Sequence, residues 1–319
     1  MRLGFLSFFG ASTLLLSGLL QAETSKTSPS VGSRSASQGR ASVSSNLRNN
    51  VVKSKSSAST STGVLSATGV ENLYGYLEFR PSYTSYQGEF HTENTAEVGY
   101  KLNSTMKTGY VQFFSTNLMN GSNATQGMNL LANDGFLYFK AKDIFKSSDN
   151  RLALAYQLRL ITPTDSGKYS AGFRGAVRNQ FLLSYSYNDF IKSELSYHPI
   201  YQGYVKSGRF DSTGTASANS YFDHQFIFNQ EIHPAPKFTL YLPVIYQLTS
   251  YREFAGAANS GRWRKKVVFW PELDYEINPV HMIGVSFYSG NLSSEYGSGF
   301  DFSEGFKNGV TQLVWGINL

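Results

Sequence analysis

Apolar and polar side chains alternate along most of the chain from residue 73 to the C-terminus. In residues 151–162, leucine or tyrosine occupies every second position from Leu152 to Leu160, and alanine, glutamine or arginine lies between them. A β-strand directs successive side chains to opposite faces, so this segment would have one apolar face and one more polar face. Segments of this kind predict twelve strands, at about residues 73–86, 92–102, 105–114, 135–142, 151–162, 176–187, 191–202, 221–232, 237–251, 266–277, 281–289 and 309–319.

The connections between the predicted strands alternate in length. Those after the second, fourth, sixth, eighth and tenth strands are short, and those after most odd-numbered strands are longer, with the first a short exception. Transmembrane barrels carry tight turns at one end and extended loops at the other, whereas a soluble sandwich has no reason to sort its loops by length. No apolar run after residue 73 is long enough to cross a bilayer as a helix. The pattern therefore predicts an all-β fold, a transmembrane antiparallel up-and-down barrel over residues 73–319.

Two regions of different composition precede residue 73. Residues 1–22 combine Arg2, an apolar centre and a small Ala22, which is the layout of a secretory signal peptide. Residues 23–72 contain fifteen serines and no aromatic residue, and they hold six basic against two acidic side chains. Such a segment cannot bury enough apolar surface to offset the entropy of ordering, which predicts a disordered tail. A sharper hypothesis is that the cations of this tail enter the barrel as a plug.

Composition and charge narrow the range of functions. The 319 residues include no cysteine, which excludes disulfides, cysteine-ligated metal sites and thiol catalysis. The net charge of +6 is unevenly distributed, because 7 basic and 2 acidic residues precede residue 73. The remaining 21 basic and 20 acidic residues leave the predicted barrel close to neutral. A nucleic-acid-binding function of the folded part therefore loses its main support.

The C-terminal segment has the form of a last barrel strand. Leu313, Trp315, Ile317 and Leu319 occupy alternate positions up to the end of the chain. With the twelve predicted strands, residues 73–319 resemble the outer-membrane β-barrel proteins of Gram-negative bacteria. The resemblance implies an outer-membrane location with the tail in the periplasm, contact with outer-membrane lipid and lipopolysaccharide, and recognition of the last strand by the barrel assembly machinery. The chain departs from that family in its final residue, which is leucine in place of the usual phenylalanine.

The predicted inner face of the barrel carries charges of both signs. Its basic residues are Lys140, Arg151, Arg159, Arg178 and Lys192. Its acidic residues are Asp223, Glu231, Glu272, Asp274 and Glu276. Opposite charges on opposing walls would polarise a water-filled lumen and filter solutes by sign and size. The alternative is that these residues form ion pairs across a narrow lumen and close it.

Other groups offer contacts to solutes and lipids. Four aromatic residues of the predicted inner face are candidate stacking surfaces for sugar-like solutes, namely Tyr76, Tyr138, Tyr241 and Trp270. One predicted outer loop holds a basic run that could meet lipopolysaccharide phosphates, formed by Arg262, Trp263, Arg264, Lys265 and Lys266. The alternative for this run is a solvated rim, or pairing with the acidic residues of the loop at about 290–308.

Catalytic and cofactor motifs are weak. A barrel-type lipid hydrolase needs serine and histidine on one face, and Ser196 with His198 is the only pair two residues apart. Asp223 and His224 are adjacent and would face opposite ways. No metal-ligand spacing or phosphate-binding glycine motif occurs, so no cofactor is predicted.

The sequence thus predicts a passive outer-membrane channel for small hydrophilic solutes, with anionic or sugar-like molecules favoured by the basic wall. The alternatives are an outer-membrane lipid hydrolase and a structural or adhesive barrel whose loops bind partners.

Overall fold

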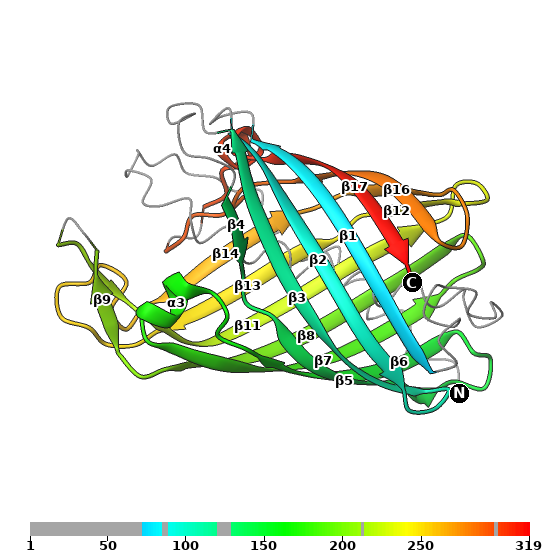
Figure 1. Cartoon of the computed structure of the whole chain (residues 1–319), viewed down its shortest axis with the longest axis horizontal. Helices are drawn as coiled ribbons and strands as arrows, with labels where there is room; N and C mark the ends of the chain where they lie inside the picture. The colour runs from blue at the N-terminus through cyan, green and yellow to red at the C-terminus, as the bar shows by residue number, and fades with distance from the viewer. Residues whose placement is uncertain (1–71, 85–88, 120–128, 212–213, 297–298) are drawn as a thin grey trace.

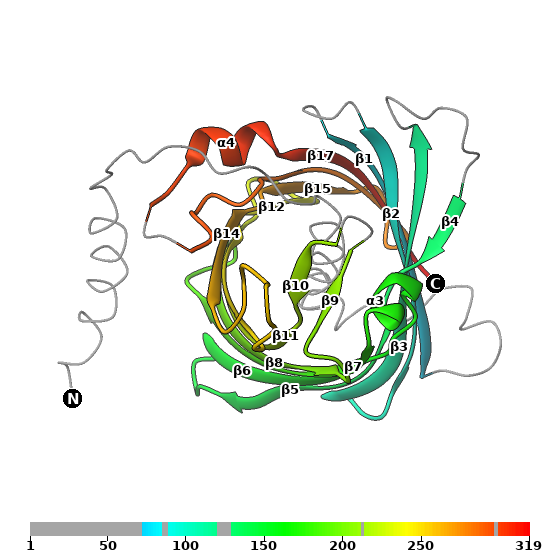
Figure 2. The same cartoon turned by 90° about the vertical axis from the view of Figure 1, so that its left-hand side faces the viewer.

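Twelve antiparallel strands close into a barrel in the computed structural model (Figure 1, Figure 2). The structure describes residues 72–84, 89–119, 129–211, 214–296 and 299–319. The predicted signal peptide and almost all of the predicted tail lie outside these residues. No helix in the described ranges has the length and apolar character to cross a membrane.

The spanning strands follow the predicted segments in number and order. Ten of them carry a single label: β1 (Leu73–Thr84), β2 (Glu89–Lys101), β3 (Met106–Met119), β5 (Phe136–Lys146), β6 (Leu152–Ile161), β7 (Phe173–Ser186), β8 (Ile191–Tyr204), β11 (Ser220–Ile232), β16 (His281–Tyr288) and β17 (Val310–Asn318). The other two are interrupted, as β12 (Phe238–Tyr241) with β13 (Val244–Tyr251), and β14 (Trp263–Phe269) with β15 (Glu272–Glu276). Pro243 and Pro271 lie at these interruptions. Proline lacks the N–H that a strand ladder requires, so each strand is broken at its proline.

Pairing of β1 with β17 closes the barrel. The register places Phe79 opposite Trp315, and their ring centroids are 5.7 Å apart on the outer surface of this seam. Every other spanning strand pairs with its neighbours in chain order. Closure leaves no free strand edge along the wall, so the backbone groups of the spanning region pair internally, as a lipid environment requires.

The two ends of the barrel differ as predicted. At the turn end, Asn103, Asn188 and Asn278 each accept backbone hydrogen bonds from residues two and three positions later, which forms tight asparagine turns. The loop end carries the short elements β4 (Asn129–Ala132), α3 (Ser166–Ser170), β9 (Gly208–Phe210), β10 (Ala216–Ala218) and α4 (Phe302–Lys307). In the end-on view, α3 and the β9–β10 hairpin fall within the outline of the barrel (Figure 2). Within the described residues, the predicted sorting of connections by length is confirmed.

The outer surface of the barrel is apolar. Leu273, Val285 and Leu313 are register neighbours on β15, β16 and β17, and they are 39, 44 and 62% exposed. Alternate residues on the same strands, including Glu272, Ser286 and Gln312, are buried inside. A soluble protein does not present such a continuous apolar band to water, so the chain is a transmembrane β-barrel, as the alternation predicted.

The apolar band allows a direct test of the membrane-spanning surface. Val285→Arg places a charge near the middle of β16 on the outer face, and we expect it to lower the free energy of unfolding by about 2–4 kcal/mol. Urea unfolding of the protein in lipid vesicles, followed by tryptophan fluorescence, measures this change. The control is Tyr169→Arg in α3, where the side chain is 51% exposed at the loop end. An equal loss in both variants would contradict a lipid-facing position for Val285.

Candidate functional site: the inner wall of the barrel

Charged and amide side chains form continuous rows on the inner wall, because the register aligns inward residues of neighbouring strands. One row follows Lys140, Gln157 and Gln180 across β5, β6 and β7. It continues through His198, Gln225, Gln247 and Lys266 on β8, β11, β13 and β14. We call these seven residues the amide row. Side chains up to six strands apart in the barrel therefore occupy one band of the wall.

Hydrogen bonds join the amide row from strand to strand. His198 Nε2 lies 3.0 Å from Gln180 Nε2, and His198 Nδ1 lies 3.1 Å from Gln225 Oε1. Gln225 Nε2 donates to Gln247 Oε1 at 3.5 Å. Amides offer both donors and acceptors, so this row can exchange hydrogen bonds with the hydroxyl groups of a passing solute.

Arg159 and Arg178 lie side by side next to the amide row. They face each other in the register between β6 and β7, and they are only 1 and 3% exposed. Arg159 donates to Gln157 Oε1 at 3.3 Å, and its guanidinium carbon lies 4.1 Å from the centroid of the Phe136 ring. Arg178 contacts His198 Nδ1 and donates to Gln225 Oε1 at 2.6 Å.

This arginine pair lacks a carboxylate partner. In the part of the chain that the structure describes, no ion pair joins either guanidinium to an acidic side chain, and Nε and Nη1 of Arg159 and Nε of Arg178 have no hydrogen-bond acceptor. Glu97 and Asp223 act on Arg159 and Arg178 from beyond ion-pair distance, and each guanidinium presents a planar set of donors that matches a carboxylate or phosphate. The pair is therefore suited to bind a small anion.

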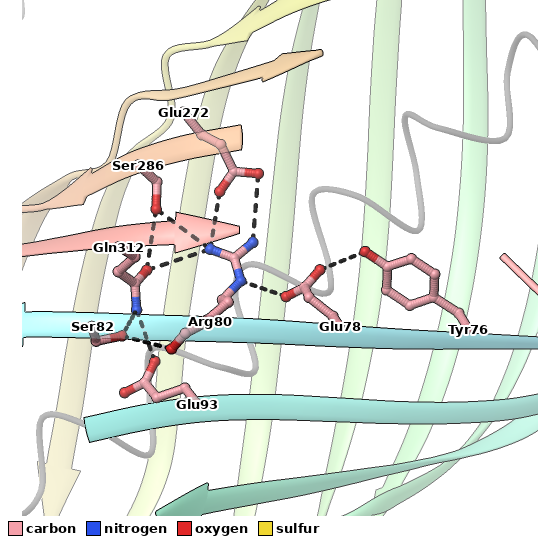
Figure 3. Close-up of polar contacts among 8 residues, drawn as sticks. All are labelled: Tyr76, Glu78, Arg80, Ser82, Glu93, Glu272, Ser286 and Gln312. Carbon is pink, nitrogen blue, oxygen red and sulfur yellow. Dashed lines mark hydrogen bonds and ion pairs between the residues drawn. The ribbon is translucent and has the colours of Figure 1, made fainter. Parts of the chain in front are cut away.

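A second polar group is centred on Arg80 of β1 (Figure 3). Its Nε donates to Glu78, and its Nη1 donates to Glu272 Oε2 at 3.0 Å and to Gln312 Oε1 at 3.4 Å. These contacts cross β17 and β16 to reach β15 on the inside of the barrel. The guanidinium also lies 5.6 Å from the ring centroid of Trp270, so Arg80 joins four strands and one aromatic ring.

The Arg159–Arg178 pair and the carboxylates of β15 lie on different parts of the wall. Four strands separate β6 from β15 on one side of the ring, namely β7, β8, β11 and the β12–β13 strand. The remaining six strands separate β6 from β15 on the other side. Arg159 on β6 and Glu272 on β15 therefore lie on nearly opposite sides. Asp274 is also buried on β15, and the Tyr138 hydroxyl donates to Glu97 Oε1 at 2.7 Å on β2.

The predicted inner residues divide into two groups. The structure places eight of the ten on the inner side of their strands, with exposures of 3, 1 and 3% for Lys140, Arg159 and Arg178. Lys192 Nζ lies 2.6 Å from Glu194 Oε1 and 3.6 Å from Glu231 Oε2. Asp223 Oδ2 accepts a hydrogen bond from Gln202 Nε2 at 2.7 Å.

Two predicted inner residues lie at the ends of their strands. Arg151 precedes β6 and is exposed in the turn, and Glu276 is exposed at the turn end of β15. Both have the correct strand phase, but they lie where the barrel wall ends. Their place in the lumen stays a prediction, because alternation along the sequence does not reveal where a strand leaves the barrel wall.

Several inner charges were missing from the prediction. Glu78 and Arg80 share the phase of Tyr76 on β1, so the signal was available in the sequence. Lys107 lies in the segment whose phase was ambiguous, and it contacts Glu97 at 3.7 Å. His198 was considered only as a catalytic candidate.

The residues proposed for hydrolysis do not form a catalytic pair. Ser196 and His198 share the inner face, but the ring nitrogens of His198 are engaged by Arg178, Gln180 and Gln225. Asp223 is buried inside, and the neighbouring His224 lies on the outer face, where its ring stacks on that of Trp263 with centroids 5.8 Å apart.

The basic run at the loop end is divided between two faces. Arg264 forms an ion pair with Glu295, and Arg262 lies 5.8 Å from the ring centroid of Tyr296, so this loop contacts the loop between β16 and β17. Lys266 belongs to the inner amide row and lies 5.6 Å from the ring centroid of Tyr288. Partial burial, with smaller contributions from Tyr251 and Glu295, raises the pKa of the Tyr296 hydroxyl. Trp263 and Lys265 have the opposite strand phase and lie on the outer side.

The search for a metal site in the described residues and the two sequence comparisons found nothing. The described ranges contain no group of three or more histidine, aspartate or glutamate side chains that could hold a metal ion. No protein-family model matches the chain. No curated protein matches it either.

The chain resembles several solved barrels. A NanC porin aligns with a TM-score of 0.48 and 13% identity over 76% of this chain and 98% of that chain. A KdgM porin aligns with a TM-score of 0.42 and 8% identity over 76% and 97%. OmpT, an outer membrane protein of Vibrio cholerae, aligns with a TM-score of 0.36 and 10% identity over 78% and 97%. These are similarities of overall fold.

Proposed function

We propose that this protein is an outer-membrane channel for the passive diffusion of small hydrophilic anions. The observation that carries the proposal is the buried Arg159–Arg178 pair, which has unused N–H donors and no carboxylate partner among the described residues. The apolar outer surface supports a membrane location. The polar inner wall supports passage of solutes that a lipid bilayer excludes.

Selection by this wall needs no covalent chemistry. An anion that enters the barrel loses part of its hydration shell and gains charge-assisted hydrogen bonds from the two guanidinium groups. Glu272 and Asp274 on the far side repel the anion and direct it towards the arginine pair. Conduction requires binding that is weak enough for release, and the glutamines of the amide row offer neutral hydrogen bonds next to the arginine pair, to which the solute can pass.

The neighbouring groups favour sugar-like anions over inorganic ones. The glutamine side chains of the amide row can exchange hydrogen bonds with the hydroxyl groups of a solute. The rings of Tyr138 and Trp270, predicted as stacking surfaces, are 4 and 2% exposed and are covered by Lys107 and Arg80. A solute with a carboxylate and several hydroxyl groups would use both the arginine pair and the amide row. We propose such acidic, hydroxyl-rich molecules as the preferred solute class.

The outer-facing residues of the basic run suit a membrane partner. We propose that Lys265 and Trp263 contact lipopolysaccharide, with the lysine at a phosphate and the indole ring at the interface. We also propose that Leu313, Trp315, Ile317 and Leu319 serve as the assembly signal, since the first two are 62 and 46% exposed on the outer surface of β17.

Planar-bilayer recording tests the channel function. We expect discrete conductance steps and, in a potassium chloride gradient, a reversal potential of the sign that indicates anion preference. Gluconate should carry current or reduce the chloride current at millimolar concentration. Absence of discrete conductance from protein shown to be folded would contradict a channel, and a reversal potential of the opposite sign would contradict the role of the arginine pair.

A further inference from the structure

Two complementary polar side chains lie opposite each other on the inner wall, towards the turn end of the barrel. Asn229 of β11 is 1% exposed, and among the described residues its side-chain nitrogen and oxygen have no hydrogen-bond partner. Its register partner on β8, Glu194, is 2% exposed, and Oε2 of this carboxylate has no donor there either. An amide donor and a carboxylate acceptor at this spacing could bond to each other. Both instead remain available to a third molecule.

The indole N–H of Trp270 adds a third group of this kind. Trp270 is 2% exposed, and its Nε1 has no acceptor in the part of the chain that the structure describes. Its backbone amide donates to the carbonyl of Pro243 at 3.0 Å. Pro243 lies beside Asn229, because the next residue along the chain, Val244, is the register partner of Phe228. Asn229 and Trp270 are therefore two strand spacings, or about 10 Å, apart across the sheet.

An apolar patch borders these polar groups. Ile227, Ile245 and Val268 are register partners on β11, β13 and β14, and all three are at most 3% exposed. They form one cluster with Trp270. Sites for small molecules combine apolar surface with a few fixed polar groups. A sugar ring matches this combination, because it presents C–H groups on its faces and hydroxyl groups at its edges.

The charges around Asn229 favour an uncharged ligand. Oε1 of Glu194 is already bound to Lys192 Nζ at 2.6 Å. An anion at this position would approach the carboxylate of Glu194, and a cation would approach the ammonium group of Lys192, so an ion of either sign meets a like charge. The amide of Asn229 and the indole of Trp270 are neutral hydrogen-bonding groups, which suit hydroxyl groups.

This group of residues is separate from the arginine pair. Arg178 of β7 aligns with Ile200 of β8, and Ile200 aligns with Asp223 of β11. Asn229 follows Asp223 by six residues along β11, with positions of the amide row and of the apolar patch between them. At about 3.3 Å per residue, the arginine pair and Asn229 are about 20 Å apart along the wall. A small solute therefore contacts the two places one after the other.

We propose that Asn229, Glu194 and Trp270 form a second binding site of the channel, for an uncharged ring that bears hydroxyl groups, such as a neutral monosaccharide. Asn229 donates to one hydroxyl group and accepts from another, Oε2 of Glu194 accepts, and the indole N–H donates. The apolar patch packs against the C–H groups of the ring. The inference extends the solute range beyond anions. It rests on the proposed channel function for passage of the solute, whereas binding at the site does not.

Fluorescence of a protein with one tryptophan tests the binding without any conductance. The chain has three tryptophans, so the changes Trp263→Phe and Trp315→Phe leave Trp270 alone. In the folded full chain in lipid vesicles, we expect glucose to change the Trp270 emission with saturation on the order of millimolar. Asn229→Leu should raise the dissociation constant roughly tenfold, because two neutral hydrogen bonds are lost.

The matched control is Gln230→Leu in the same background. Gln230 is the next residue of β11 and has the opposite strand phase, and its Oε1 accepts a hydrogen bond from Ser193 at 2.8 Å. This variant should bind glucose like its parent. An equal loss in Gln230→Leu, or an unchanged response in Asn229→Leu, would overturn the proposal. Absence of any glucose response in the folded parent would overturn it as well and would leave the anion channel untouched.

Urea unfolding separates a binding role of Asn229 from a structural one. Since its amide has no partner among the described residues, Asn229→Leu should unfold at the same urea concentration as the parent or at a higher one. A lower midpoint would assign Asn229 to the support of the fold and contradict the site. Replacing Arg159 and Arg178 with glutamine should leave glucose binding unchanged. Glucose binding by a protein without discrete conductance would retain the site and contradict the channel.

Discussion

Replacing Arg159 and Arg178 together with glutamine is expected to abolish the preference of the channel for anions. A hydrogen bond to a charged group contributes about 1.5–3 kcal/mol. Since about 1.4 kcal/mol corresponds to a factor of ten, the loss of both guanidinium groups should lower the ratio of anion to cation permeability by tenfold or more. The glutamine side chains keep hydrogen-bonding capacity, and removing two adjacent like charges should not destabilise the barrel. Reversal potentials in a salt gradient measure the change.

Two further variants separate the roles of charge and geometry in this pair. Arg178→Lys keeps the positive charge but loses the planar set of donors, so it should retain anion preference while weakening the effect of gluconate on the current. Arg151→Gln is the matched control, because Arg151 is exposed in a turn. If Arg151→Gln changed the permeability ratio as much as the double variant, surface charge rather than the inner pair would be responsible.

Replacing Arg80 with alanine is expected to destabilise the barrel by about 3–5 kcal/mol. Glu78 and Glu272 are 1 and 6% exposed, and loss of the guanidinium removes the cation that pairs with both buried carboxylates. The contacts to Gln312 and the Trp270 ring are lost as well. Urea unfolding in lipid vesicles, followed by tryptophan fluorescence, gives the free energy.

The cause of this loss is testable with compensating changes. The combined variant Glu78→Gln, Arg80→Met and Glu272→Gln removes all three charges, and we expect it to recover most of the stability, because neutral groups avoid the desolvation cost. Arg174→Ala is the control for removing an arginine, since Arg174 is exposed near the loop end of β7. If the combined variant were as unstable as Arg80→Ala, loss of packing rather than uncompensated charge would explain the result.

The candidate site was only partly predictable. Strand phase identified Arg159, Arg178 and Glu272 as inner residues, since alternation is a local property of each strand. It did not identify the role of Arg80, which binds a glutamate 192 positions later in the chain. Nor could it locate the ends of the barrel wall, where Arg151 and Glu276 are exposed.

The sequence by itself determined the number of strands, the outer and inner faces, and the sorting of turns and loops. These properties follow from local alternation and from the need of a membrane-spanning sheet to expose apolar side chains and to pair every backbone group. Only the tertiary structure decided which charges meet. The Arg159–Arg178 pair, the amide row and the contacts of Arg80 depend on the register between strands, which is set by hydrogen bonds between segments distant in the chain.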